Sequence, residues 1–373
     1  MADQVPGDVG EPRAASPRTW LLLGPKPGDN GQLLALAEAL GWPFEVKRMA
    51  YRPWELLTNR LLRVTLLGLD RARSSPLLPP WPELILTAGR RNEPVARWVQ
   101  ARAGGRDRVR LVHVGRPWAA PELFDLIVST PQYALPERAN ILCNEAPMHR
   151  VSAARLKAEA ERVRPQLAGL PRPWTAVLLG GHVGPYSFDE AAAERLADQL
   201  NALAADGGAL LLSTSARTPA ATVERLLARL QRPMHLYRWR RDDPDNPYFG
   251  LLGLADQVVV TSDSMSMLIE AVATGKPVLI FDLGFPRPKG RPTRRALIFH
   301  LGRALGPARL RRDVGEIHRA QIAAGRAAWL GQPAPARWQT APLADTERAA
   351  ARVRAWFAPG MDAVARHEKS PSS

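Results

Sequence analysis

The sequence has almost no cysteine and no long apolar run, and both absences limit what the protein can be. Cys143 is the only cysteine in 373 residues, which excludes an internal disulfide and a cysteine-based zinc site. No stretch of about 20 predominantly apolar residues occurs, so we expect no membrane-spanning helix. The first residues lack an apolar run beside a basic flank, so we expect no secretory signal. These features favour the cytoplasm, or a peripheral position on the cytosolic face of the inner membrane.

Lysine is also scarce, although the chain is strongly basic. Only six of its 51 basic residues are lysine, and the formal net charge is +15. No zinc finger, basic zipper or RNP-type aromatic motif accompanies this charge, so we expect no nucleic-acid partner. An anionic membrane surface or a bound diphosphate would account for the positive charge equally well.

The chain is long enough for two domains, and 46% of its residues are hydrophobic. Both ends are too polar to bury a core, so we predict disordered tails at residues 1–19 and 366–373. A hinge rich in proline and glycine at 169–173 predicts a boundary between domains at 20–168 and 174–340. A final helix, within 341–365, is expected to pack back on the first domain.

Short apolar runs alternate with helical segments in both halves, which is typical of parallel sheets. We therefore predict an α/β fold of two doubly wound, Rossmann-like domains that face a cleft. The expected strands lie at 20–24, 44–49, 84–88, 109–114, 125–129, 140–142, 175–179, 209–213, 234–239, 257–260 and 277–281. The expected helices lie at 31–40, 92–103, 153–167, 189–205, 219–230, 248–254, 265–274 and 345–357.

The most informative window is 246–282, where a buried strand leads into a cluster of hydroxyls at a helix start. Ser262 and Ser264 are suited to this position, because free backbone N–H groups and the positive end of the helix dipole attract an anion there. Glu270 follows less than two turns later, where a carboxylate can accept hydrogen bonds from ribose. The alternative is an ordinary strand–helix–strand unit with a good N-cap.

The hydroxyl cluster is followed by Glu270, then by four residues, and then by Gly275 and Pro277. This arrangement resembles the donor-binding segment of glycosyltransferase-B enzymes. The resemblance implies that Ser264 and Ser266 hold the diphosphate of a nucleotide-sugar and that Glu270 holds the ribose. It makes 20–168 the acceptor-side domain and 174–340 the donor domain. The nucleotide-diphosphate sugar would be a substrate, and no cofactor or metal is required.

A series of further motifs resembles the elongated-mitochondria family of mitochondrial-fission proteins, which has bacterial members. It comprises Lys26–Gln32, Ala88–Arg90, Leu179–Gly181, Ser215–Pro219, Asn246–Tyr248 and Val260–Met267. Two positions depart from the family pattern. Ala216 replaces the first of two arginines, and Pro131-Gln132-Tyr133 replaces a His-Asp pair. The second change removes a candidate acid/base pair and keeps a non-catalytic alternative open.

Four other residues, in three loops, are candidates for ligand contact. Asp29 lies in the predicted first-domain loop and is the candidate catalytic base, although it can equally cap a helix. Gly180 and Gly181 open the second domain and allow a phosphate to approach the backbone, and a tight turn is the alternative. Arg217 is placed to neutralise a phosphate, unless it is a surface arginine beside a cap.

Two basic and apolar stretches suggest a surface partner. Residues 51–73 combine leucines with arginines, as an interfacial helix on an anionic bilayer does, and a core helix with a solvated arginine face is the alternative. Residues 287–312 carry nine basic residues and no acidic one.

We thus expect a glycosyltransferase-like protein that uses a nucleotide-diphosphate sugar and an envelope-related or lipid-linked acceptor. The family resemblance implies an alternative, a non-enzymatic membrane-surface adaptor that recruits a protein partner. A nucleotide-sugar epimerase with a Gly-x-Gly-x-x-Gly loop and a Tyr-x-x-x-Lys pair is disfavoured, because the chain has neither motif.

Overall fold

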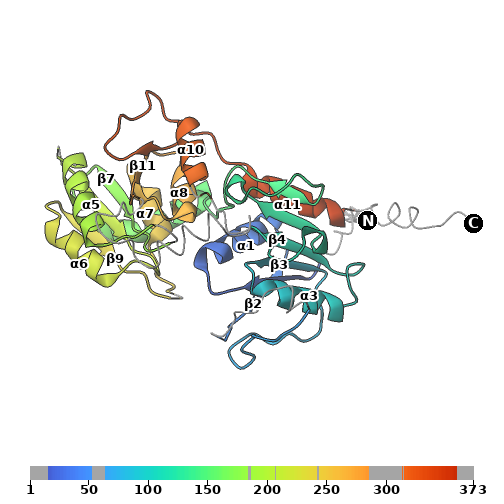
Figure 1. Cartoon of the computed structure of the whole chain (residues 1–373). Helices are drawn as coiled ribbons and strands as arrows, with labels where there is room; N and C mark the ends of the chain where they lie inside the picture. Colours follow the sequence, from blue (N-terminus) through green and yellow to red (C-terminus); the bar gives the residue numbers. More distant parts are fainter. Residues whose placement is uncertain are drawn as a thin grey trace, which may run out of the picture. The chain divides into compact units, whose positions relative to one another are not determined.

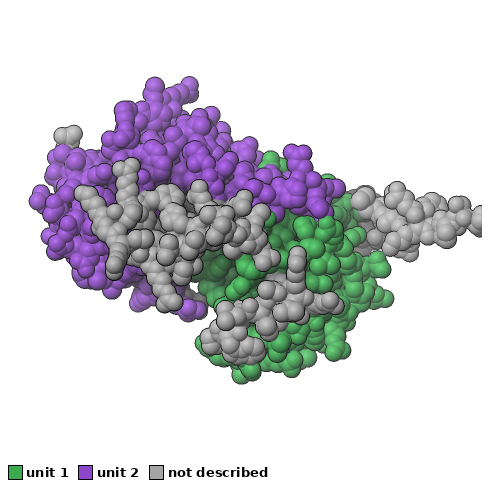
Figure 2. Space-filling model, in the orientation of Figure 1, with its two compact units in different colours: residues 1–128, 346–373 green, residues 129–345 purple. Residues whose placement is uncertain are grey.

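The computed structural model describes residues 16–52, 64–183, 186–205, 207–241, 243–284, 313 and 315–358. The chain divides into two compact units (Figure 2). Unit 1 comprises residues 1–128 and 346–373, and unit 2 comprises residues 129–345. The predicted hinge at 169–173 lies within unit 2. Most of the first predicted tail, and all of the second, lie outside the described residues.

The first sheet has six strands in the order β2-β1-β3-β4-β5-β6, and its pairings from β2 to β5 are parallel (Figure 1). β1 and β3 are apolar and fully buried, as expected of central strands with both faces covered. The strand order reverses between them. The strands are β1 (Thr19–Leu23), β2 (Phe44–Arg48), β3 (Leu84–Ala88), β4 (Arg110–Val114), β5 (Leu126–Ser129) and β6 (Ile141–Cys143).

The helices of unit 1 are α1 (Pro27–Leu40), α3 (Asn92–Arg102) and α11 (Asp345–Arg354, whose first residue falls in unit 2). α1 starts at Pro27, four residues before the predicted Gly31, because proline suits the first position of a helix. It ends at Gly41, whose φ of 70° provides the left-handed cap. At the other end of the chain, the Arg354 guanidinium donates to the Ala39 carbonyl over 2.6 Å and ties α11 to α1.

The second sheet has the order β12-β11-β10-β7-β8-β9, and all of its pairings are parallel. Numbered from β7, this is the Rossmann order 3-2-1-4-5-6, and the order reverses between β7 and β10. The strands are β7 (Trp174–Leu178), β8 (Ala209–Ser213), β9 (Met234–Tyr237), β10 (Gln257–Thr261), β11 (Val278–Phe281) and β12 (Ala328–Trp329).

The helices of unit 2 flank this sheet (Figure 1). Two of them, α4 and α7, approach closely because Gly250 and Gly253 of α7 face α4. A β-carbon added to Gly253 would lie 2.6 Å from the Leu156 carbonyl oxygen, so only glycine fits. The helices are α4 (Ala153–Val163), α5 (Glu190–Leu203), α6 (Ala220–Arg229), α7 (Tyr248–Leu254), α8 (Met265–Val272) and α10 (Gly315–Ala323).

Two parallel six-stranded sheets with flanking helices confirm the predicted α/β fold of two doubly wound, Rossmann-like units. Each of the eleven expected strands occurs within two residues of its predicted bounds. β12 and α10 were not expected. β12 has only two residues, which are too few to produce a recognisable pattern. Among the described helices, none combines the length and the apolar character needed to cross a bilayer.

Candidate functional site

The predicted donor site lies at the carboxyl ends of β7 and β10, where the strand order of the second sheet reverses. In doubly wound sheets, ligands bind in the crevice beyond the strand ends at such a reversal. The loop after β7 supplies Gly180 and Gly181, and the loop after β10 supplies Ser262 and Ser264. The topology of unit 2 therefore brings these residues, which are some 80 positions apart, to one edge of the sheet.

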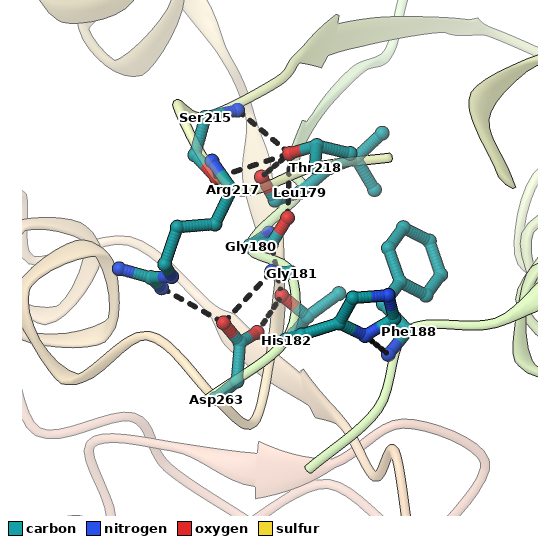
Figure 3. Close-up of polar contacts among 10 residues, drawn as sticks. Leu179, Gly180, Gly181, His182, Phe188, Ser215, Arg217, Thr218 and Asp263 are labelled. Atoms are coloured by element: carbon teal, nitrogen blue, oxygen red, sulfur yellow. Dashed lines mark hydrogen bonds and ion pairs between the residues drawn. The ribbon is translucent and has the colours of Figure 1, made fainter. Parts of the chain in front are cut away.

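A buried carboxylate joins the two loops (Figure 3). The Gly181 amide donates to Asp263 Oδ2 over 2.8 Å, and the Thr261 hydroxyl donates to Asp263 Oδ1 over 2.7 Å. The same hydroxyl accepts a hydrogen bond from the Gly180 amide over 2.8 Å. The Asp263 side chain is inaccessible to solvent. The amides of the glycine loop, which a phosphate was predicted to approach, are therefore already hydrogen-bonded within unit 2, and one of them bonds to a carboxylate.

Arg217, in the loop after β8, is the cation that pairs with this carboxylate. Its Nη2 lies 2.8 Å from Asp263 Oδ2, and its side chain is 41% exposed. The positive charge of Arg217, which was predicted to neutralise a phosphate, is therefore already balanced by the Asp263 carboxylate. A guanidinium has five N–H donors, so the pairing leaves others for a ligand.

Glycine is required at both loop positions because the neighbouring groups are too close for a side chain. A β-carbon on Gly180 would collide with the Asp263 carboxyl, and one on Gly181 would collide with the Arg217 backbone carbonyl. Thr218 holds the same arrangement from the β8 side. Its hydroxyl donates to the Leu179 carbonyl over 2.9 Å and accepts from the Ser215 amide over 2.8 Å (Figure 3).

The serines at the start of α8 have different surroundings. Ser262 is buried, and its hydroxyl accepts a hydrogen bond from the Leu283 amide over 3.1 Å. Ser264 is the N-cap residue and is 7% exposed, yet its side chain makes no capping hydrogen bond. Ser266, in the first turn, is partly exposed. The first turn of α8 is therefore not capped by the side chain of its own N-cap residue, which is the usual acceptor at a helix start.

Glu270, the predicted ribose ligand, lies six residues beyond Ser264, or about 9 Å along the helix axis. The Tyr248 hydroxyl donates to its Oε2 over 2.6 Å. Burial raises the pKa of Glu270 to about 7, and the opposing effects of the Tyr248 hydrogen bond and of Arg150 and Arg155 are smaller. Burial also raises the pKa of Tyr248, and the neighbouring Glu270 adds to this shift. One oxygen of the Glu270 carboxyl group is thus hydrogen-bonded to the Tyr248 hydroxyl.

Asp29, the candidate base, lies in the first turn of α1 rather than in a loop. Its side chain is 34% exposed, and its Oδ2 is 3.9 Å from Lys26 Nζ. Next to it, the Asn30 side chain accepts from the Gly24 amide and donates to the Gly24 carbonyl, which fixes the turn after β1. This position is at the strand-order reversal of the first sheet, between β1 and β3.

Two residues of the arrangement were missing from the predicted site. Asp263 stands between Ser262 and Ser264 in the sequence, and its position directly after a strand was the available signal. Tyr248 was visible only as the end of the Asn-Pro-Tyr motif. Within the described ranges, no group of three or more His, Cys, Asp or Glu side chains is arranged to hold a metal ion.

Solved structures with a similar fold include transferases and epimerases. A glycosyltransferase from Rickettsia africae aligns with 92% of this chain and 99% of its own length, at 11% identity and a TM-score of 0.46. MurG from Acinetobacter baumannii aligns with 91% and 99%, at 12% identity and a TM-score of 0.41. The UDP-GlcNAc 2-epimerase from Methanocaldococcus jannaschii aligns with 91% and 99%, at 12% identity and a TM-score of 0.45. Likeness at this level does not discriminate between activities.

Proteins that are similar in sequence indicate the family of this chain more narrowly than the solved structures do. The mitochondrial fission protein ELM1 of Arabidopsis thaliana is 26% identical over 222 residues, which are 53% of this chain and 51% of the relative. The chain thus spans about half the length of that plant protein. An uncharacterized protein of Rickettsia prowazekii is 24% identical over 298 residues, which are 70% of this chain and 82% of the relative. Residues 27–357 match the family described as "Mitochondrial fission ELM1". The chain belongs to the mitochondrial fission ELM1 family.

Proposed function

We propose that unit 2 binds a nucleotide-diphosphate sugar beyond the carboxyl ends of β7 and β10, and that the protein transfers the sugar to an envelope-related or lipid-linked acceptor. The observation that carries this proposal is the start of α8. It lies at the strand-order reversal, and the side chain of its N-cap residue, Ser264, makes no capping hydrogen bond. Free amides at the positive end of a helix dipole bind phosphate oxygens.

In this proposal, the diphosphate contacts the first-turn amides of α8 and the hydroxyls of Ser264 and Ser266. Arg217 contributes the guanidinium donors that Asp263 does not use. The anion would also lie beside Gly180, Gly181 and Ser262. Because these residues already form hydrogen bonds within unit 2, they would shape the site rather than bond to the anion. A buried carboxylate beside a diphosphate would repel it, and its pairing with Arg217 removes most of that penalty.

Glu270 is proposed to accept a hydrogen bond from ribose through Oε1, because Oε2 already accepts from Tyr248. The tyrosine fixes the carboxyl group in one orientation, so little entropy would be lost when the sugar binds. With a pKa of about 7, the group is partly protonated at neutral pH and can act as acceptor or donor.

The transfer step is proposed to need no metal. The acceptor oxygen would bond to the anomeric carbon as the bond from that carbon to the diphosphate oxygen breaks. Asp29 would take the acceptor proton, which requires an ionised carboxylate within hydrogen-bonding reach. The α8 amides and Arg217 would stabilise the negative charge of the leaving diphosphate.

Isothermal titration with UDP, GDP and ADP, and with their common sugar conjugates, tests donor binding. We expect wild type to bind at least one of them and Glu270→Ala to bind it about tenfold more weakly, as the loss of one hydrogen bond predicts. Glu224→Ala is the control, because this exposed glutamate lies on α6 and pairs only with Arg238 among the described residues. Wild-type protein that binds none of these nucleotides would refute the proposal.

Membership of the fission family favours a second candidate, a membrane-surface adaptor that recruits a protein partner. An anionic membrane surface fits the net charge of +15. Of the predicted membrane-facing stretches, residues 53–63 and 287–312 lie outside the described residues. Sedimentation with anionic vesicles and capture of partner proteins test this role. The adaptor role would be supported if wild type bound no nucleotide and Glu270→Ala bound the partner as well as wild type does.

A further inference from the structure

The segments that follow β1 and β3 touch at the carboxyl edge of the first sheet, where the strand order of unit 1 reverses. A β-carbon added to Gly89, directly after β3, would lie 3.4 Å from Asp29 Oδ2. The same carboxyl oxygen is 3.9 Å from Lys26 Nζ. An acidic and a basic side chain from the start of α1 therefore lie beside the backbone that follows β3.

Two consecutive arginines, Arg90 and Arg91, follow Gly89 at this edge. The Arg90 guanidinium carbon lies 4.9 Å from the centre of the Trp118 ring, in the loop after β4. The Arg91 guanidinium carbon lies 5.8 Å from the centre of the Tyr51 ring, in the segment after β2. Since the strands lie in the order β2-β1-β3-β4, the two arginines flank the reversal, one on each side.

Hydrogen bonds fix the two aromatic residues that the arginines contact. The Tyr51 hydroxyl bonds to Asn92 Oδ1, and the Asn92 side-chain amide donates to the Leu22 carbonyl over 2.7 Å. The Glu93 carboxyl group accepts two backbone hydrogen bonds from the loop after β4, one of them from the Trp118 amide over 2.8 Å. The end of β1, the start of α3 and the loops after β2 and β4 thus form one connected frame around the arginines.

The accessible side chains at this edge are mostly basic. Lys26 is 75% exposed and Asp29 is 34% exposed, and Arg90 and Arg91 are partly exposed. Glu93 is buried and is used within unit 1, so three basic side chains and one acidic side chain remain accessible in this group. Guanidinium groups bind phosphate oxygens through pairs of N–H donors. A phosphate monoester carries nearly two negative charges and a carboxylate carries one, so the excess of positive charge favours phosphate.

We propose that this edge of the first sheet binds the phosphate group of a phosphate-bearing acceptor, and that Arg90, Arg91 and Lys26 are its ligands. The inference rests on the proposed function, because it names the chemical class of the acceptor that Asp29 would serve as base. A phosphate held by the three basic side chains would bring a hydroxyl of the same molecule to Asp29.

Glutamine variants test the role of the two arginines, because glutamine removes the charge and keeps a polar side chain. We expect Arg90→Gln/Arg91→Gln to bind glycerol phosphate at least about tenfold more weakly than wild type, as the loss of charge-assisted hydrogen bonds predicts. Arg102→Gln is the matched control and should bind like wild type. Arg102 also lies over a tryptophan ring, 5.3 Å from the centre of Trp98, but at the opposite end of α3.

A second double variant, Arg90→Lys/Arg91→Lys, separates binding from folding. It keeps both charges but loses the contact geometry of the guanidinium groups. We expect it to bind glycerol phosphate more tightly than the glutamine variant does. Equal weakening in the lysine and glutamine variants, together with equal losses in melting temperature, would show a structural role and overturn the inference.

The titrations are made with the α8 site filled by whichever of UDP, GDP and ADP binds best, or without nucleotide if none binds. Sedimentation with phosphatidylcholine vesicles, with and without phosphatidic acid, distinguishes a lipid phosphate from a soluble one. Weaker binding of the glutamine variant to phosphatidic acid vesicles alone assigns a lipid acceptor, and weaker binding to glycerol phosphate alone assigns a soluble acceptor. Either result supports the inference.

The failure of this inference can be told apart from the failure of the proposed function. Wild type that binds a nucleotide but neither phosphate probe, or binds both probes no better than the glutamine variant does, overturns the inference and leaves donor binding intact. Phosphate binding that depends on Arg90 and Arg91, in a chain that binds no nucleotide, supports the phosphate site and refutes the proposed donor.

Discussion

Asp263 organises the candidate site of unit 2. Its carboxylate is inaccessible to water, so it must be paired with groups of the protein. Its two oxygens accept hydrogen bonds from the Gly181 amide, the Thr261 hydroxyl and the Arg217 guanidinium. A buried carboxylate is tolerated only when it is paired in this way. The glycine loop, the end of β10 and the loop after β8 are therefore linked through one side chain.

Removing this carboxylate should destabilise the fold. Asp263→Ala leaves the Gly181 amide without its acceptor and Arg217 without its counter-ion, and we expect a loss of about 2 kcal/mol in the free energy of unfolding. Urea denaturation measures it. Asp198→Ala is the control, because its ion pair with Arg229 is exposed and should contribute far less. Equal midpoints for Asp263→Ala and wild type would contradict the structural role.

Glu270 should make stability depend on pH in an unusual direction. Its pKa is raised from 4.5 to about 7, so the folded state holds this proton more tightly than the unfolded state does. The unfolded chain loses the proton near pH 4.5 and the folded chain near pH 7, so this group lowers stability as pH rises between those values.

Glu270→Gln cannot titrate, so we expect its stability to fall less than that of wild type between about pH 4.5 and pH 7. Urea denaturation at a series of pH values makes the comparison. Parallel profiles for the two proteins across that window would show that the carboxyl group has no raised pKa.

Close helix packing supports the same region. α7 carries Tyr248, the partner of Glu270, and α7 lies against α4 through Gly250 and Gly253. Lys276 closes the carboxyl end of α7, because its Nζ donates to the carbonyls of Leu252 and Gly253 over 2.6 and 2.7 Å. The position of Tyr248 thus depends on how closely α7 approaches its neighbour.

Gly253→Ala should push the two helices apart. The added carbon would lie 2.6 Å from the Leu156 carbonyl oxygen, and overpacking of this kind costs about 1–3 kcal/mol. Gly31→Ala, in helix α1, is the matched control, because its added carbon meets no atom within 4 Å. Alanine there should stabilise the protein slightly. Thermal unfolding compares them, and a fall in melting temperature for both or for neither would contradict this packing.

The elements were largely predictable because the central strands are apolar runs bounded by turn residues. The start of α8 was also predictable, since Thr261 to Ser264 lie between a strand and a helix in the sequence. The partners within the site were not. Asp263 bonds to Gly181, 82 positions away, and Tyr248 bonds to Glu270, 22 positions away. Such pairs depend on the order of the strands in the sheet, which local patterns do not encode.

At the scale of the whole chain, the two roles proposed above are sugar transfer and membrane-surface recruitment. The predicted domain bounds, the cleft and the assignment of Asp29 as base remain predictions. Both roles can use the same scaffold, because a fold determines where a ligand binds rather than which reaction the bound ligand undergoes. Nucleotide binding at α8 is the property that only the first role requires.

A crystal structure of the whole protein soaked with UDP, GDP or ADP tests this claim most directly. We expect a diphosphate within hydrogen-bonding distance of the first-turn amides of α8 and the Ser266 hydroxyl, with the ribose beside Glu270. A nucleotide bound elsewhere, or a soaked crystal with no ligand at α8 and no binding in solution, would contradict it.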